Sequence, residues 1–227
     1  ARKFIVPDAK ITFKAIDASK KEEAVAAAQG FDVLINAAKP DFNRILMEAA
    51  LEVGVNYQDL ASGEKGAAEQ LAFDQKFKEK NLVGLIDAGA SPGVTNLMAA
   101  EVAAKLKRIE YVKFRLLEDA SSDVPFTPWS KEITLEEFSY RPWIYEDGSL
   151  MTRANFSGEE VYNFPEPFMN ERCYLVDQEE TETVPLYIRA RRVDVKVGGS
   201  EMRSARMFHK LGFMKSKPIK INGAKIA

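Results

Sequence analysis

Three short segments of the chain combine small and polar residues in a way that suits nucleotide binding. Asp17 and Ala18 follow one predicted strand, residues 36–40 follow the next, and residues 88–93 follow the last. In a parallel α/β sheet, ligands bind beyond the carboxyl ends of the strands, where the loops diverge and helix N-termini present free N–H groups. All three segments are therefore candidates for a binding site.

The first two segments would hold different parts of a dinucleotide. The small residues Asn36, Ala37 and Ala38 would let a ribose or a flat ring lie close to the backbone, and Asp17 could accept a hydrogen bond from an adenine amino group. The same residues are also typical of ordinary strand-ending loops, in which Asp17 is merely a turn acid. Because the diagnostic G-x-G-x-x-G loop is absent from this sequence, spacing alone leaves both interpretations open.

The third segment could bind an anion. Ser91, Pro92 and Gly93 open a predicted helix, and the free N–H groups and positive end of that helix could hold a substrate carboxylate. A plain helix that starts with a proline has the same sequence.

Few other side chains are suited to acid–base or metal chemistry. Glu179 and Glu180 could pair with a substrate ammonium group, although in a run with Glu182 they are more typical of a solvated face. The single histidine, His209, excludes a multi-histidine metal site, and we expect it to be structural or solvent-facing. No residue is a convincing catalytic base, so the catalytic residues stay unknown and no metal is expected.

Composition narrows the class of protein. The chain has 32 basic and 34 acidic residues, and this near balance disfavours nucleic acid as a partner. Its one cysteine, Cys173, cannot form an intramolecular disulfide, which is typical of a reduced, cytoplasmic protein. The apolar stretches are shorter than about ten residues and so too short to cross a bilayer. We therefore expect a soluble cytoplasmic protein that acts on a small molecule.

Strands and helices alternate through residues 1–107. Strands are predicted at residues 11–16, 33–35, 55–60 and 82–86. Helices are predicted from a Ser19–Glu22 capping box to Gly30, and at residues 43–53, 67–80 and 95–107, the last with Leu97, Met98, Val102 and Leu106 turned inward. Short buried strands separated by helices indicate parallel pairing. The fold class is therefore α/β, with a partial Rossmann-type doubly wound parallel sheet.

Residues 108–227 follow a different pattern. Residues 111–116 and 192–197 alternate apolar and polar side chains, which predicts strands with one wet face. Asp147-Gly148 and Asn222-Gly223 are typical hairpin turns, and helices are expected near residues 134–138 and 200–211. This half is predicted to be an α+β domain with a mostly antiparallel sheet.

Several runs resemble the saccharopine dehydrogenase family in order and spacing. In the first half they are residues 31–38 (FDVLINAA), 47–60 (MEAALEVGVNYQDL) and 87–96 (DAGASPGVTN). In the second half Trp129-Ser130, Pro142 with Asp147-Gly148, and residues 178–185 resemble the substrate half of the same family. Together these matches extend over about residues 10–225.

The resemblance implies a nicotinamide enzyme. Members of this family use NAD or NADP to form or oxidise a carbon–nitrogen bond of an amino acid, and they include saccharopine reductases, carboxynorspermidine synthases and lysine dehydrogenases. The likeness implies a first strand and glycine loop ahead of Ala1, a catalytic crevice between the two domains, and a homodimer formed through the second sheet.

The resemblance also assigns residues to the two ligands. It places Asp17 and Ala18 beside the adenine, and residues 36–38 under the ribose and nicotinamide. On the substrate side it places Trp129 and Ser130, with residues 91–93 in the crevice.

One residue departs from the family pattern. Where saccharopine reductases have an acid before the Pro-Gly pair, this chain has Ser91, whose hydroxyl does not ionise near neutral pH. Lysine dehydrogenases also lack that acid, so oxidative deamination of the lysine 6-dehydrogenase type is one alternative. A non-catalytic relative that keeps the fold for binding or dimerisation is another.

Overall fold

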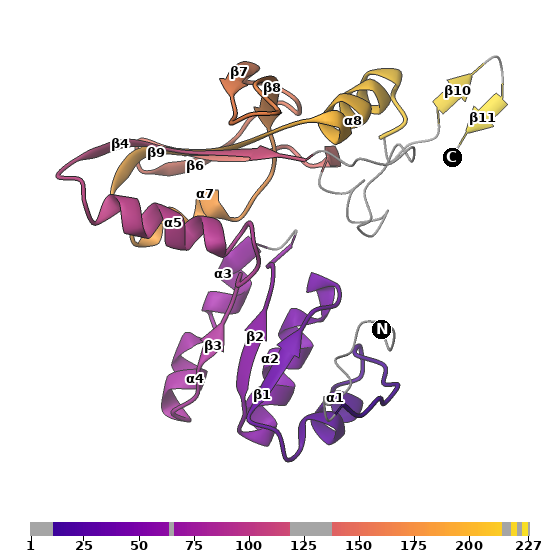
Figure 1. The fold of residues 1–227 in the computed structure, drawn as a ribbon. Coiled ribbons are helices and arrows are strands. Elements are labelled where there is room, and N and C mark those ends of the chain that lie inside the picture. The colour runs from indigo at the N-terminus through magenta and orange to yellow at the C-terminus, as the bar shows by residue number, and fades with distance from the viewer. Residues whose placement is uncertain (1–10, 64–65, 119–137, 215–218, 222–223, 227) are drawn as a thin grey trace. The chain divides into compact units, whose positions relative to one another are not determined.

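The computed structural model describes residues 11–63, 66–118, 138–214, 219–221 and 224–226 (Figure 1). The chain divides into two compact units, Ala1–Ala88 and Gly89–Ala227. This division comes earlier than the predicted one at residue 107, because helix α5 (Val94–Ala103) packs against the core of the second unit through Ala99 and Ala103.

The first unit contains the expected parallel sheet. Its three described strands lie in the order β1-β2-β3. They are β1 (Val33–Asn36), β2 (Asn56–Asp59) and β3 (Gly84–Leu85). Gln58 at the centre lies opposite Ile35 on one side and Leu85 on the other. Parallel neighbours bring the carboxyl ends of all three strands to one edge of the sheet.

Helices precede and separate the described strands of the first unit. They are α1 (Lys21–Ala28), the 3-10 helix η2 (Pro40–Phe42), α2 (Asn43–Val53), α3 (Gly66–Leu71) and α4 (Asp74–Glu79). Helix α2 has the predicted bounds and ends at Gly54, which adopts φ 85° and donates its N–H to the carbonyl of Ala50. The single helix predicted over residues 67–80 is instead two short helices.

Apolar side chains of these helices form one core with the sheet. Leu46, Met47 and Phe77 pack with Tyr57 of β2, and Leu34 of β1 packs against them. The alternate residue Ile35 points to the other face of the sheet and is 53% exposed. The described helices therefore bury one face of the sheet.

The strand and capping box predicted at the start of the chain are both wrong. Residues 11–17 form no strand in the described part of the chain, and α1 begins without a side-chain cap. Asp17 instead makes a local turn, in which its Oδ1 accepts hydrogen bonds from the N–H and hydroxyl of Ser19 at 3.0 and 2.6 Å. Its own N–H donates to Glu23 at 2.8 Å. Such side-chain bonds to the local backbone compete with regular structure.

The second unit is built around strand β9. Its other elements are β4 (Ile109–Leu117), β5 (Trp143–Glu146), β6 (Ser149–Thr152), β7 (Glu160–Asn163), β8 (Asn170–Leu175), α7 (Glu180–Thr183), the 3-10 helix η3 (Val184–Leu186) and α8 (Ser200–Leu211). Strand β9 (Ala190–Gly198) pairs antiparallel with β5 and β8 and parallel with β4. The sheet is therefore mostly antiparallel, as the sequence predicts.

Both predicted hairpins have strands at the expected places. Strands β5 and β6 pair antiparallel on either side of Asp147 and Gly148, whose positive φ angles of 49° and 87° match a tight hairpin turn. Strands β10 (Ile219–Ile221) and β11 (Ala224–Ile226) also pair antiparallel, while residues 222 and 223 themselves lie outside the described residues, as do residues 134–137 of a predicted helix.

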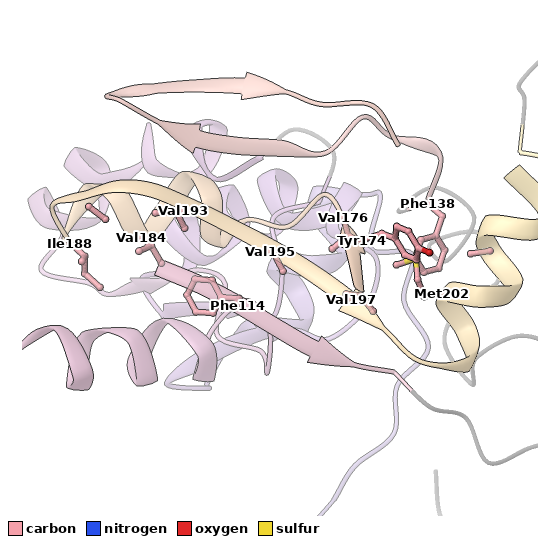
Figure 2. Packing of buried hydrophobic residues seen from close by; sticks show 12 residues of the cluster. Phe114, Phe138, Tyr174, Val176, Val184, Ile188, Val193, Val195, Val197 and Met202 are labelled. Atoms are coloured by element: carbon pink, nitrogen blue, oxygen red, sulfur yellow. The ribbon is translucent and has the colours of Figure 1, made fainter. Parts of the chain in front are cut away.

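The core of the second unit lies along one face of β9 (Figure 2). Val193, Val195 and Val197 are fully buried there, together with Phe114 of β4 and Met202 of α8. The apolar residues of the alternating pattern predicted over residues 192–197 therefore form the buried face of β9.

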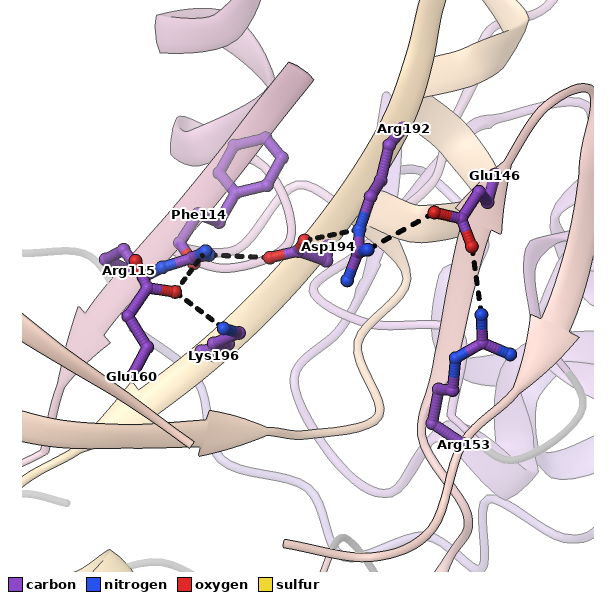
Figure 3. A network of polar contacts seen from close by, with 8 residues as sticks. All are labelled: Phe114, Arg115, Glu146, Arg153, Glu160, Arg192, Asp194 and Lys196. Atoms are coloured by element: carbon purple, nitrogen blue, oxygen red, sulfur yellow. Dashed lines mark hydrogen bonds and ion pairs between the residues drawn. The ribbon is translucent and has the colours of Figure 1, made fainter. Parts of the chain in front are cut away.

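The other face of β9 is not wet, which corrects the sequence prediction. Asp194 and Lys196 are buried in a chain of ion pairs (Figure 3). Arg115 of β4 donates to Asp194 at 2.7 Å and to Glu160 of β7 at 2.8 Å, and Lys196 contacts Glu160 at 2.5 Å. Mutual pairing thus lets charged residues occupy a covered face.

These contacts perturb the titration of Glu160. Partial burial alone would raise the pKa of its carboxyl, but hydrogen bonds from Lys196 and Arg115 outweigh it and hold the pKa at about 2. The network continues from Asp194 through Arg192 to Glu146.

No helix in the described part of the chain is both long and apolar enough to cross a membrane.

Candidate functional site

A buried polar residue lies at or just beyond the carboxyl end of each described strand of the first unit. Asn36 ends β1 and lies opposite Asp59, which ends β2, while Asp87 follows β3. Their exposed fractions are 4%, 1% and 6%. Asn36 therefore lies at the carboxyl edge of the parallel sheet, where the strand order predicts it, but its side chain is buried.

The Asn36 side chain shapes the loop that follows it. Its amide donates to the carbonyl of Lys39 at 3.1 Å and to the side-chain oxygen of Asn43 at 2.6 Å, and its own oxygen accepts the N–H of Ala38 at 2.9 Å. Asn43, at the start of α2, also accepts the Tyr57 hydroxyl at 3.0 Å. All these bonds are internal, so Asn36 fixes the backbone of the loop rather than presenting a polar group to solvent.

Asp59 fixes the loop after β3 in the same way. Its Oδ1 accepts the N–H of Asp87 at 2.9 Å, and its backbone carbonyl accepts the N–H of Ala88 at 3.0 Å. The Gln70 amide donates to its other oxygen, and Ser62 donates to Asp87 at 2.7 Å. Burial raises the pKa of the Asp59 carboxyl. The pKa of the Tyr57 hydroxyl is also raised, mainly by burial and to a smaller extent by the negative charge of nearby Asp59.

Sequence reasoning missed this network. Asn43 and Gln70 lie on helices, where polar residues are usually solvated, and Asp59 was noticed only as part of a family-like run. A signal was present, because an asparagine in the first turn of an apolar helix and an aspartate ending a buried strand both need polar partners.

Above this network the loop presents small side chains. Ala37 and Ala38 are exposed, and Ala18 is half-buried. Asp17 is exposed, and hydrogen bonds from Ser19 lower the pKa of its carboxyl. The hydrogen bonds and ion pairs of Asp17 are with Ser19, Lys20 and Glu23, not with the network around Asn36.

A second cluster lies within the second unit, at the start of α5. The hydroxyls of Ser91 and Thr95 both donate to Oε1 of Glu180, at 2.5 and 2.6 Å. Next to Thr95, the Asn96 amide donates to the Thr183 hydroxyl at 2.9 Å. These three hydrogen bonds, between residues that lie 85–89 positions apart in sequence, join the predicted Ser91-Pro92-Gly93 segment and the start of α5 to α7.

Most backbone donors at this helix start are already used. The N–H groups of Val94 and Thr95 donate to the carbonyls of Gly89 and Ala90, at 3.0 and 3.1 Å, and that of Gly93 donates to the Asn96 side chain at 3.1 Å. Pro92 has no N–H. The hydroxyls, rather than the helix N–H groups, are therefore the prominent polar groups of the segment.

Glu180 corrects the sequence interpretation of a solvated acidic run. Its side chain is fully buried, and Oε2 has no hydrogen-bond partner among the described residues. Its neighbours Glu179 and Glu182 are only half-buried. Thr181 and Thr183 are also buried. The short helix α7 is therefore largely buried, although its run of glutamates suggested a solvated segment.

Two other predicted residues, Trp129 and Ser130, lie outside the described residues. His209 is exposed, with its ring 4.9 Å from that of Phe156. The described residues contain no group of three or more histidine, cysteine, aspartate or glutamate side chains placed to hold a metal ion.

Comparison with known proteins agrees with the expected family. Residues 2–85 match the model of the saccharopine dehydrogenase NADP binding domain. The chain is 30% identical over 196 residues to carboxyaminopropylagmatine dehydrogenase from Synechocystis sp., which covers 80% of this chain and 49% of the relative. It is 23% identical over 203 residues to carboxynorspermidine synthase from Vibrio alginolyticus, covering 83% of this chain and 49% of that protein.

A solved structure shows the same fold. Apo saccharopine dehydrogenase (L-Glu forming) from Saccharomyces cerevisiae matches with a TM-score of 0.66 at 17% identity, over 90% of this chain and 50% of the yeast chain. The chain thus spans about half the length of the relatives that it matches.

Proposed function

Because residues 2–85 belong to the saccharopine dehydrogenase NADP-binding domain family, we propose that this protein is an NAD(P)-dependent oxidoreductase. It acts on the carbon–nitrogen bond of an amino acid or a polyamine-type secondary amine. The observation that carries the proposal is the loop after β1, where exposed alanines rest on a buried hydrogen-bond network. The nicotinamide ring, when bound, accepts or donates the hydride of this reaction.

The residues after β1 fit the ribose and ring of a dinucleotide. Ala37 and Ala38 are exposed and carry no atom beyond Cβ, so a flat group can approach their backbone closely. The bonds from Asn36 to Ala38 and Lys39 hold that backbone in place before any ligand arrives, which lowers the entropy cost of binding. Asp17 and Ala18 remain the proposed adenine contacts.

The second unit holds the residues that we propose for substrate contact. Ser91, Pro92 and Gly93 stay candidates for substrate contact, as do Trp129 and Ser130, and the Glu180 carboxylate lies behind the Ser91 hydroxyl. A negative group there suits an amine substrate by charge. A homodimer formed through the second sheet also stays a prediction.

The names of the relatives favour one group of substrates. Carboxyaminopropylagmatine and carboxynorspermidine are polyamines that carry a carboxyl group, and we propose a substrate of this class ahead of saccharopine or lysine. Lysine would be deaminated, whereas the carboxylated polyamines would be cleaved at, or formed through, a secondary amine.

The test is oxidation of a panel of amines by the intact protein. Carboxyaminopropylagmatine, carboxynorspermidine, saccharopine and lysine are each mixed with NAD or NADP, and the appearance of reduced nicotinamide is followed by absorbance. We expect turnover with at least one carboxylated polyamine. Turnover with lysine alone would select the deamination alternative, and nicotinamide binding without any turnover would select the non-catalytic one.

A substitution at the alanine loop tests where the cofactor lies. Ala38→Leu places a larger side chain on the exposed loop without filling the core, so we expect the KM for the cofactor to rise at least about tenfold. Ala26→Leu is the matched control, because Ala26 is equally exposed on α1. Equal cofactor KM values for the two variants would refute the proposed location.

A further inference from the structure

We infer that Ser91 and Glu180 form a two-residue proton relay, in which the Ser91 hydroxyl passes a proton from the substrate amine to the buried Glu180 carboxylate. This inference rests on the proposed function, because it needs an amine substrate at Ser91. It supplies the proton acceptor that the sequence lacks at position 91, where saccharopine reductases resembling this chain have an acid.

The relay rests first on geometry. Ser91 is half-buried, and its hydroxyl donates to Oε1 of Glu180 at 2.5 Å. A hydroxyl that donates on one side keeps lone pairs with which to accept on the other. Ser91 therefore has the two bonding directions that a relay needs.

Glu180 is placed as an acceptor that solvent does not reach. It is fully buried, and its Oε1 already accepts two hydroxyl protons, from Ser91 and Thr95. Its Oε2 is buried and accepts no hydrogen bond from the part of the chain that the structure describes. A buried carboxylate normally has all its acceptor positions filled or a cation beside it, so the empty position marks an acid with unused capacity.

The surroundings of the carboxylate favour a functional role over a purely structural one. No ion pair involving Glu180 occurs among the described residues, whereas the buried acid Asp194 of the same unit is held by two arginines. The α5 N-terminus lies beside Glu180 through Thr95 and offers only the partial positive charge of a helix end. A cationic amine at Ser91 would bring the missing opposite charge.

The proton transfer balances without any further reactant. A substrate ammonium group gives one proton to Ser91 Oγ, while the original Ser91 proton moves to Oε1 of Glu180. The products are a neutral amine, an unchanged serine and a neutral glutamic acid. The neutral amine has a free electron pair on nitrogen, which the carbon–nitrogen bond needs when its carbon loses a hydride. Thr95 holds the carboxyl group in place during the transfer.

Infrared difference spectroscopy of the intact protein tests this step without turnover. Carboxynorspermidine or carboxyaminopropylagmatine is added to the protein, and the bands of ionised and protonated carboxyl groups are compared before and after binding. For the unaltered protein we expect one carboxylate band to disappear and one protonated carboxyl band to appear. The same change should be absent in Glu180→Gln and Ser91→Ala, and present in Ser91→Thr, which keeps the hydroxyl.

Rates give a second readout. We expect Glu180→Gln and Ser91→Ala each to lower kcat by at least about a hundredfold, the usual contribution of a positioned proton acceptor. Ser91→Thr should restore most of the rate. Glu182→Gln is the matched control on the same short helix, since Glu182 is half-buried and lies two residues from Glu180, and it should keep both the rate and the infrared change.

The outcomes separate the relay from the proposed function. If the unaltered protein turns over an amine but shows no carboxyl change, or if Ser91→Ala keeps the full rate, the relay is overturned and the proposed function stands. If no amine is oxidised but the carboxyl change occurs, the proposed function fails and the proton transfer stands. The absence of any carboxyl change with every amine overturns the relay.

Discussion

Removing the Glu160 carboxylate should weaken the second unit and flatten its response to acid. Glu160 lies between Lys196, whose side chain is 10% exposed, and Arg115, whose side chain is 4% exposed. The Glu160→Gln variant leaves Lys196 without its acidic partner. Breaking a buried ion pair on one side usually costs about 3–5 kcal/mol. Since Glu160 itself is 27% exposed, we expect about 2–3 kcal/mol at pH 7.

The acid response follows from the lowered pKa. The pKa of Glu160 is about 2 in the folded protein against an ordinary 4.5, so its stabilising effect is complete above pH 4.5 and is lost as the pH falls towards 2. In that window the unfolded chain binds a proton that the folded chain does not. The unaltered protein should therefore lose up to about 1.4 kcal/mol per pH unit from this group alone, and Glu160→Gln should not.

Urea unfolding at pH 7, 4 and 3 measures both effects. Trp143 lies in β5 of the second unit, so tryptophan fluorescence can follow the unfolding of that unit. The control is Glu159→Gln, which removes a neighbouring acid that pairs with Arg172 at 42% and 66% side-chain exposure and so contributes little. Equal slopes of stability against pH for Glu160→Gln and the unaltered protein between pH 4 and 3 would refute this reasoning.

Two further substitutions test the loops that shape the site. Asn43→Ala removes the shared partner of Asn36 and Tyr57 and should destabilise the first unit by about 2–3 kcal/mol through unsatisfied buried groups, seen as faster hydrogen exchange in β2; unchanged exchange would contradict it. Gly199→Ala should lower the thermal midpoint by several degrees, because Gly199 adopts φ 109° and a Cβ would lie 2.1 Å from the carbonyl oxygen of Glu118. A midpoint equal to that of the unaltered protein would show that this turn is free to relax.

The spacing of apolar residues in the sequence correctly located the helices that have one apolar stripe and a clear end signal. Helices α2 and α8 have the predicted bounds, because each has an apolar stripe and a glycine, Gly54 or Gly212, in the left-handed conformation at its end. Strand β9 was also found, but its polar face is buried. Alternation shows which side chains share a face of a strand, and it does not show whether the polar face meets water or other charges.

Helix α5 shows a different limit of sequence reasoning. Its large apolar residues were predicted to face inward, yet Leu97 and Met98 are 71% and 64% exposed, and Val102 is 56% exposed. The small residues Ala99 and Ala103 pack instead against the core of the second unit. A helix approaches a sheet most closely on the face that carries its small residues. A prediction of the buried face from hydrophobicity alone therefore selected the larger side chains, which are exposed.

For a related reason, the sequence predicted the loops of the candidate site but not the buried residues that hold these loops in place. The positions of residues 36–38 and 91–93 followed from strand order and motif resemblance. Asp59 bonds the loop after β3 across 28 positions of sequence, and Glu180 bonds Ser91 across 89. Polar partners at such separations leave no local pattern, so only the three-dimensional structure identifies them.

The central place of β9 sets an order of events during synthesis. Strand β4 pairs with β9 from Ile109 opposite Ala190 onward, and β5 and β8 also pair with β9. Until the ribosome releases β9, strands β4, β5 and β8 lack their common neighbour. The long loop between β4 and β9 must then close. The nascent second unit therefore spends most of its translation with unpaired strand edges, and its assembly depends on the last strand of the sheet to be made.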